Sequence, residues 1–129
     1  MLEFGQPLHA FDLRFADQGI VVRHANRGES LALLDGTELR LSPDTMVIAN
    51  QRNPIGLAGI MGGLESGVDS STQAIFLESA YFRPGSIANS CRKYGLQTDA
   101  SYRFERGVDP SEQRRAVLRA SELFQEICG

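Results

Sequence analysis

Short apolar runs separated by turn-forming residues dominate the first sixty residues of the chain. Leu31–Leu34 and Leu39–Leu41 flank an Asp35-Gly36 pair. This pair favours a tight hairpin because it readily adopts the positive φ angles of such turns. Met46–Ala49 and Ile55–Ile60 are separated by polar residues and predict a second hairpin.

Two further strands are expected outside these hairpins. Ile20–Arg23 is one short candidate, and Ile75–Ser79 is another, in which successive side chains would point to opposite faces. The first twelve residues are expected to be extended chain or loop, since Gly5 and Pro7 interrupt their apolar pattern.

Two helices are expected late in the chain. The first begins at Pro84, which suits the first helical turn, and stops at Gly95, a natural left-handed C-terminal residue. The second begins at Asp109-Pro110-Ser111-Glu112, which matches a capping box. Behind it runs the stripe of an amphipathic helix, formed by Ala116, Ala120, Leu123 and Ile127. The pattern predicts an α+β fold over residues 1–129, a single domain in which a hairpin-built mixed sheet is flanked by two helices.

Between these helices lies the most unusual segment, Gly95–Pro110. It mixes charged, aromatic and hydroxyl side chains with two glycines and shows neither a helical nor a strand period. A long irregular segment in a compact domain is typically functional. The segment is therefore predicted to be an ordered functional loop.

Composition fits a globular domain, with 42% apolar and 22% charged residues. No apolar run reaches the roughly 18 residues of a membrane span, and no leader peptide is expected. Cys91 and Cys128 form no Cys-x-x-Cys pair, so two buried, reduced thiols and a cytoplasmic location are expected. No cluster of His, Cys or acidic residues has the spacing of metal ligands, and no metal site is expected.

Charge is uneven along this chain, whose formal net charge is −3. Residues 1–82 hold five arginines against ten acidic residues, whereas residues 83–119 hold eight basic residues against four acidic ones. A local basic surface can attract phosphates. Its arginines can equally pair with Glu105, Glu112 or Glu122, and the chain as a whole is less basic than a typical RNA-binding domain.

A glycine cluster, Gly59-Ile60-Met61-Gly62-Gly63, follows an apolar run. It matches neither of the common phosphate-binding glycine motifs, and no lysine follows it. The remaining uses of glycine are positive φ angles and the close approach of backbone to another strand or to a ligand. Both readings remain open at this point.

Glu78 is a carboxylate in an otherwise apolar strand, where it shares a face with Phe76. One interpretation places Glu78 on a solvated outer face. The other places it partly buried at the edge of a cleft, where a carboxylate needs hydrogen-bond partners.

Three more residues are candidates for chemistry or for its support. Thr98 and Ala100 are small enough to leave room for an aromatic ring, and Thr98 has no activating base nearby, which favours a role in positioning a water or an ester oxygen. His9 can be oriented by Asp12 and titrate near neutral pH, or can be a satisfied structural histidine. His24 is expected on the surface.

Four separated motifs resemble the beta subunit of bacterial phenylalanyl-tRNA synthetase, and the resemblance covers about the whole chain. The matching part of that subunit is its pair of third and fourth domains, which carry an editing site. The matching residues begin inside a motif of the family, so the upstream part of these domains is expected to be missing. The four motifs are Gly5–Asp12, Gly59–Gly63, Leu77–Ala80 and Gly95–Pro110.

The resemblance implies hydrolysis of tyrosine that has been wrongly attached to tRNA(Phe). It implies catalytic roles for three residues: Glu78 would meet the phenolic hydroxyl, and His9 and Thr98 would order the attacking water. The substrate-binding positions that it implies are Gly59, Gly62, Gly63 and Ala100.

It also implies a parent enzyme, an (αβ)₂ heterotetramer with an alpha subunit that joins phenylalanine to its tRNA with ATP and magnesium. No cofactor is expected in the part represented by this chain. Two other interpretations are a non-catalytic module for tRNA binding or subunit packing, and a free-standing editing protein of related fold.

Overall fold

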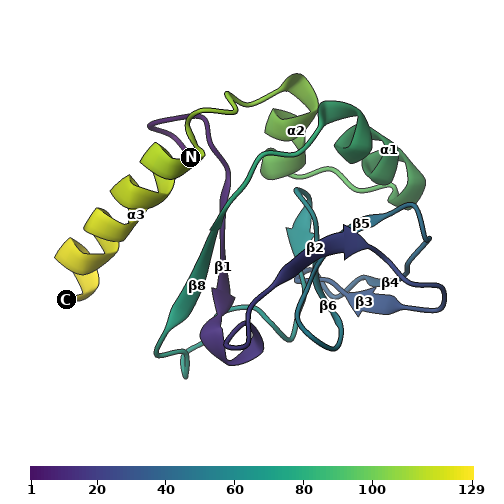
Figure 1. Cartoon of the computed structure of the whole chain (residues 1–129), viewed down its shortest axis with the longest axis horizontal. Helices are drawn as coiled ribbons and strands as arrows, with labels where there is room; N and C mark the ends of the chain where they lie inside the picture. Colours follow the sequence, from purple (N-terminus) through teal and green to yellow (C-terminus); the bar gives the residue numbers. More distant parts are fainter.

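The strands form three small sheets in which every pair of neighbours is antiparallel. This computed structural model describes residues Met1–Gly129 (Figure 1). The strands are β1 (Leu8–Asp12), β2 (Val21–His24), β3 (Ser30–Ala32), β4 (Glu38–Arg40), β5 (Met46–Ala49), β6 (Pro54–Leu57), β7 (Met61–Gly62) and β8 (Ile75–Ser79). The largest sheet has the order β2-β5-β6-β7, while β1 pairs with β8 and β3 pairs with β4.

Both predicted hairpins are confirmed. β3 and β4 are joined by the expected turn, in which Gly36 has a φ of 85° and an Asp35 oxygen accepts the Thr37 N–H at 2.9 Å. β5 and β6 are joined by a turn that the Asn50 side chain holds, because its oxygen accepts the N–H groups of Arg52 and Asn53 at 2.9 and 2.8 Å. The strand expected near Ile20 is also present and pairs with β5.

The ribbon of β1 and β8 joins the N-terminal segment to a strand from the second half of the chain. β8 matches the expected strand, and the extended segment near the N-terminus becomes its partner, with Leu8 opposite Ser79 and Asp12 opposite Ile75. The end of β1 is fixed by Asp12, which is 1% exposed and whose carboxylate accepts hydrogen bonds from Arg14 and Thr72. These bonds lower the pKa of the Asp12 carboxyl far below its ordinary value.

Three α-helices and one short 3-10 helix complete the fold. They are η1 (Leu13–Phe15), α1 (Pro84–Tyr94), α2 (Asp99–Arg106) and α3 (Gln113–Cys128). α1 begins at Pro84 and ends at Gly95, whose φ of 65° is left-handed, as predicted. Its last residue, Tyr94, ties the helix to the sheet, because the Tyr94 hydroxyl lies 2.6 Å from the Thr45 hydroxyl and accepts the Ser42 N–H at 2.9 Å.

The prediction that Gly95–Pro110 is an irregular loop is wrong, because α2 lies inside it. Thr98 caps this helix by accepting the Ser101 N–H at 3.1 Å, while the Ser101 hydroxyl accepts the Thr98 N–H at 2.9 Å. Ala100 and Phe104, four residues apart, face the interior. Because the helix is only eight residues long, these two positions are too few to reveal a helical period in the sequence.

The predicted capping box of the last helix is also wrong. The Asp109 carboxylate accepts the Ser111 N–H at 2.8 Å in a turn that precedes the helix, and α3 begins only at Gln113 without a side-chain cap. α3 packs on β8 at one side of the molecule, away from α1 and α2 (Figure 1).

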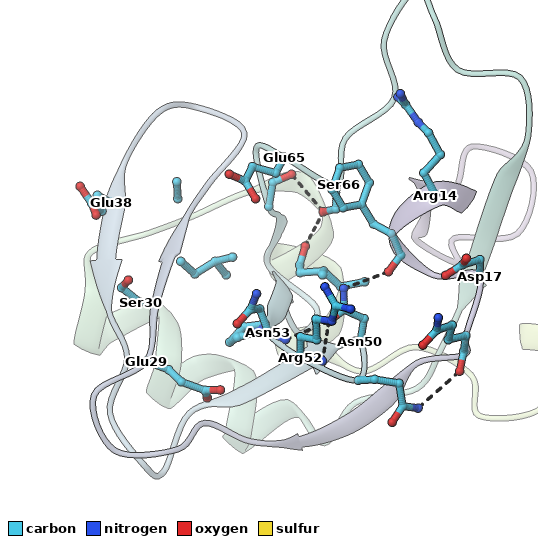
Figure 2. Close-up of a pocket in the computed structure, with 18 of the residues that line it drawn as sticks. Arg14, Asp17, Glu29, Ser30, Glu38, Asn50, Arg52, Asn53, Glu65 and Ser66 are labelled. Atoms are coloured by element: carbon cyan, nitrogen blue, oxygen red, sulfur yellow. Dashed lines mark hydrogen bonds between the residues drawn. The ribbon is translucent and has the colours of Figure 1, made fainter.

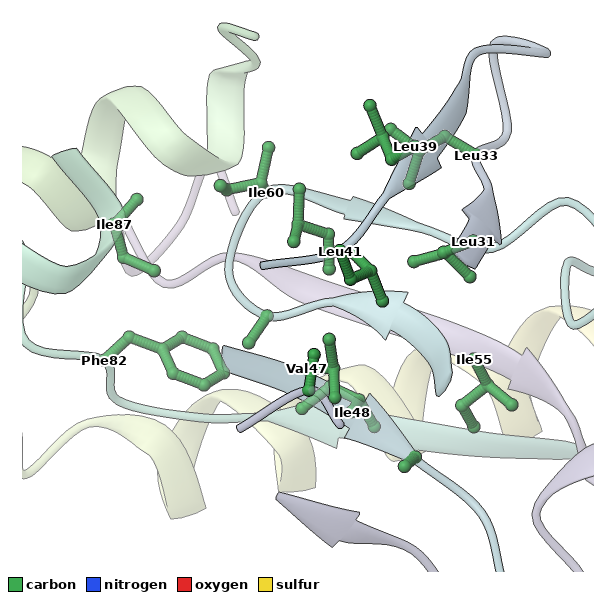
Figure 3. Packing of buried hydrophobic residues seen from close by; sticks show 14 of the residues in the cluster. Leu31, Leu33, Leu39, Leu41, Val47, Ile48, Ile55, Ile60, Phe82 and Ile87 are labelled. Carbon is green, nitrogen blue, oxygen red and sulfur yellow. The ribbon is translucent and has the colours of Figure 1, made fainter. Parts of the chain in front are cut away.

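The hydrophobic core lies between the sheets and the pair of helices α1 and α2. Figure 3 shows Phe82 and Ile87 approaching Val47, Ile48 and Ile60 from the helical side. Fully burying such side chains stabilises the fold by about 1.5–3 kcal/mol each. Of the two free cysteines, Cys91 is buried in this core as expected, whereas Cys128 is exposed near the end of α3, contrary to the prediction. No helix combines the length and apolar character needed to cross a membrane.

Gly59 is predicted to be essential for packing the helices on the sheet. It has a φ of 70°, and a Cβ atom there would lie 2.6 Å from Ile87 Cδ1 and 2.9 Å from Phe82 Cδ2. We expect Gly59→Ala to lower the free energy of unfolding by about 2–4 kcal/mol, through backbone strain and overpacking. Urea denaturation measures this effect.

Gly85→Ala in α1 is the matched control, because no atom lies within 4 Å of a Cβ atom at Gly85. Alanine favours the helix, so this variant should equal the wild type or exceed it by up to about 1 kcal/mol. Equal stability of the two variants would contradict the proposed packing role of Gly59.

Candidate functional site

A small cavity lies where the β1–β8 ribbon, the glycine cluster and α2 meet. Its volume is about 70 Å³, which is room for a group of roughly five to seven heavy atoms, since one water needs about 10–15 Å³. The residues predicted for the site that line this cavity are His9, Gly59, Gly62, Glu78 and Ala100. Thr98 and Gly63 do not line it.

His9 and Glu78 are brought together by strand pairing. They are direct partners in the antiparallel register of β1 and β8. Directly opposite residues project to the same face of a sheet, and here that face borders the cavity. The interpretation of Glu78 as a residue on a solvated outer face is therefore wrong.

The imidazole of His9 is buried, and its Nε2 atom has no hydrogen-bond partner. Burial lowers the pKa of His9 below its ordinary value of 6.5, so the ring is neutral at pH 7. The expectation that Asp12 orients His9 is wrong, because the Asp12 carboxylate is bonded to Arg14 and Thr72. His9 instead packs edge-on against the Phe11 ring, with 4.5 Å between the ring centroids.

Burial raises the pKa of the Glu78 carboxyl to about 7. Desolvation causes this shift, because removing a carboxylate from water disfavours its charged form. At neutral pH the carboxyl is therefore present in both protonation states. The protonated form can donate a hydrogen bond into the cavity, and the ionised form can accept one.

The glycines of the cluster have different tasks. At Gly62 a Cβ atom would overlap His9 Nε2 and lie 2.5 Å from His9 Cε1, so glycine lets the imidazole lie directly on the backbone of β7. Gly63 serves sheet packing instead. Its N–H donates to the Ile55 carbonyl at 2.8 Å, and a Cβ atom there would lie 2.6 Å from the same oxygen.

Thr98 supports the cavity from outside. Its hydroxyl donates to the Ile60 carbonyl at 2.8 Å and accepts the Ser101 N–H at 3.1 Å. These two bonds attach the start of α2 to the glycine cluster and so position Ala100, two residues further on. The hydroxyl is occupied by these contacts.

The apolar side of the cavity was not predicted from the sequence. It is formed largely by Phe11, Ile48, Leu57 and Phe104. Phe11 belongs to the motif that contains His9, and Phe104 belongs to the segment expected to be irregular, so their positions gave partial signals. Ile48 and Leu57 gave none, because they look like any other core residues of a hairpin.

A larger hollow of about 890 Å³ lies beside the β3–β4 hairpin (Figure 2). Some of its polar groups already have partners: the Ser66 hydroxyl donates to the Ile55 carbonyl at 2.6 Å, and Glu29 pairs with Arg23 at 2.7 Å. Of the residues predicted for the site, it contains Gly63 alone. We assign no function to this hollow.

The raised pKa of Glu78 predicts a pH-dependent stability. The carboxyl is protonated up to about pH 7 in the folded state but only up to about pH 4.5 when unfolded. The contribution of Glu78 to the free energy of unfolding is therefore fully present below pH 4.5. It decreases as the pH rises to 7, by up to about 3 kcal/mol. Glu78→Gln should remove this fall, which urea denaturation between pH 4 and 8 measures.

Glu38→Gln, on the exposed side of β4, is the control for this pH series and should retain the pH dependence of the wild type. A Glu78→Gln variant with the same pH profile as the wild type would show that the carboxyl is solvated in the folded protein.

Comparison with known proteins identifies the family of this chain. The B3/4 domain family matches residues 1–129. The chain is 57% identical to the phenylalanine–tRNA ligase beta subunits of Hahella chejuensis and Nitrosococcus oceani and 55% identical to that of Dickeya dadantii. Each comparison covers all of this chain and 16% of the relative. The chain therefore belongs to the B3/4 domain family and is similar to a segment of bacterial phenylalanine–tRNA ligase beta subunits.

Proposed function

We propose that this chain forms part of an editing site that hydrolyses the ester between tyrosine and tRNA(Phe). The observation that carries the proposal is the pairing of His9 with Glu78 at a cavity that is otherwise mainly apolar and has room for about one aromatic ring. The names of the relatives, phenylalanine–tRNA ligase beta subunits, support tRNA(Phe) as the RNA.

The selectivity of such a site follows from its polar residue. A pocket that selects phenylalanine by apolar contact rejects an analogue with one added hydroxyl only about 100-fold. A site that hydrogen-bonds the hydroxyl discriminates by about 10⁴ or more. Glu78 can make this bond in either protonation state, because a phenol both donates and accepts. Phenylalanine would leave Glu78 unpaired and would be released uncleaved.

Hydrolysis requires water to add to the ester carbonyl and the bond to the ribose oxygen to break. Nε2 of the neutral His9 ring is covered by Gly62 and has no protein partner, and we assign to it a bond with a water or a substrate group beside Gly62. Thr98 contributes by holding α2, and with it Ala100, against the glycine cluster. The aminoacyl ester is reactive, and an ordered water suffices without a dedicated general base.

The proposal places this chain within a larger cytoplasmic enzyme. In that enzyme an alpha subunit would form the (αβ)₂ assembly and would join phenylalanine to tRNA with ATP and magnesium. The residues of this chain are assigned only to the recognition and removal of tyrosine.

A second role, packing against other parts of such an enzyme, is supported by α3. Leu118, Phe124 and Ile127 are 55%, 44% and 78% exposed on this helix. Exposed apolar side chains on one element are typical of interaction surfaces. This role is compatible with editing, because α3 contacts β8 but does not line the cavity.

Glu78→Ala tests the recognition of tyrosine. In the assembled synthetase the variant should deacylate Tyr-tRNA(Phe) at least about tenfold more slowly, because a hydrogen bond to a charged or partly charged group is lost. Release of labelled tyrosine measures the rate. Glu38→Ala, with its exposed carboxylate on β4, should keep the wild-type rate. An unchanged rate for Glu78→Ala would remove Glu78 from this role.

Ala100→Trp tests the location of the ring. The indole should fill the cavity and block deacylation of Tyr-tRNA(Phe), while the synthesis of Phe-tRNA(Phe) continues because it takes place elsewhere. Asn89→Trp, on the exposed side of α1 and outside the cavity, is the control for adding an indole. Normal editing by a folded Ala100→Trp variant would mean that tyrosine binds in another place.

A further inference from the structure

Arg103 lies beside the cavity. Its side chain is half-buried and has no partner. It lies in α2, three residues after Ala100 and next to Phe104, both of which line the cavity. Residues three apart share a helix face. Its Nη1 atom lies 3.9 Å from the position of a Cβ atom on Gly5, which precedes the cavity residue Pro7 by two positions. Its guanidinium forms no hydrogen bond and no ion pair in the structure.

Several of the other basic side chains between residues 83 and 119 already have partners. Lys93 pairs with Asp44, Arg115 with Glu112 at 3.7 Å, and Arg119 with Glu122 at 3.3 Å, so the predicted pairing with Glu112 and Glu122 is confirmed. Arg106 has no carboxylate partner, but its guanidinium lies 3.4 Å from the centroid of the Tyr102 ring and donates to the Tyr102 carbonyl at 3.2 Å.

The opposite side of the cavity has the wrong charge for RNA. Beyond His9 and Gly62, the Leu34 side chain is 45% exposed and lies 3.4 Å from the position of a Cβ atom on Gly62. Its neighbours Asp35 and Glu65 are exposed carboxylates. These carboxylates repel a polyanion, whereas on α2 the Arg103 guanidinium, which has no carboxylate partner, attracts one.

We propose that Arg103 binds a backbone phosphate of the single-stranded 3′ end of the tRNA and so positions the aminoacyl ester at the cavity. The inference rests on the proposed function: when the amino acid side chain lies in the cavity, the nucleotides joined to it must lie on the adjoining surface. A partly buried guanidinium offers several N–H donors to a phosphate and gives up no internal bond to do so. Arg103 is a positioning residue, because it does not touch the reacting atoms.

Arg103→Gln tests the inference in the assembled synthetase with two substrates. Tyr-tRNA(Phe) has the phosphates, and tyrosyl-adenosine, with the same ester on the ribose, has none. We expect KM for deacylation of Tyr-tRNA(Phe) to rise about tenfold with little change in kcat, since one charge-assisted contact is lost. Cleavage of tyrosyl-adenosine should not change.

Three further measurements separate a phosphate contact from a structural effect. Arg103→Lys should restore most of the wild-type KM, because it keeps the charge. Arg27→Gln removes one exposed arginine from the turn between β2 and β3 and should leave both substrates unaffected. The dependence of log KM on log salt concentration should become shallower by about 0.7 in Arg103→Gln, the value for one phosphate contact on a single strand.

Equal losses on both substrates would overturn the inference, because Arg103 would then support the cavity rather than the RNA. Unchanged KM for Tyr-tRNA(Phe) would also overturn it. If the wild-type enzyme cleaved neither ester, the proposed function itself would fall, and the inference would fall with it.

Discussion

The pairing of β1 with β8 is the interaction on which the candidate site depends. It places His9 directly opposite Glu78, although the two residues lie far apart in the sequence. A slip of one residue in this register would turn both side chains to the other face of the ribbon. The end of β1 is held against such a slip by the buried Asp12 carboxylate and its bonds to Arg14 and Thr72. The polar pair of the site therefore depends on an ion pair that lies outside it.

Close packing around glycines sets the shape of the cavity. Gly62 lets the His9 ring pack on the backbone. Gly59 lets Ile87 and Phe82 approach the turn in which Gly59 lies. The same packing removes water from His9 and Glu78, which lowers the pKa of the histidine and raises that of the glutamate. Burial thus keeps His9 neutral and leaves Glu78 divided between its protonated and ionised forms at pH 7, and neither group is bonded to another side chain.

α2 connects the cavity with the basic surface. Its first turn is attached to the glycine cluster through Thr98, its inner face contributes Ala100 and Phe104, and Arg103 stands at the edge between the cavity and solvent. In the proposed function this short helix would contact the amino acid side chain through Ala100 and Phe104 and the RNA backbone through Arg103.

Local chemistry determined much of the fold from the sequence alone. The Asp35-Gly36 turn, the polar residues near Asn50 and the Pro84 and Gly95 boundaries of α1 act over a few residues, and the hairpins and α1 were predicted correctly for that reason. α2 was missed because eight residues show too little of a helical period. Motif resemblance indicated the candidate site residues but could not tell which of them meet.

Only long-range contacts decided that Glu78 and His9 face one cavity, that Gly63 packs a sheet, and that the Thr98 hydroxyl bonds the Ile60 carbonyl. Strand register and helix docking bring together residues far apart in the sequence, and no local pattern of residues determines that geometry.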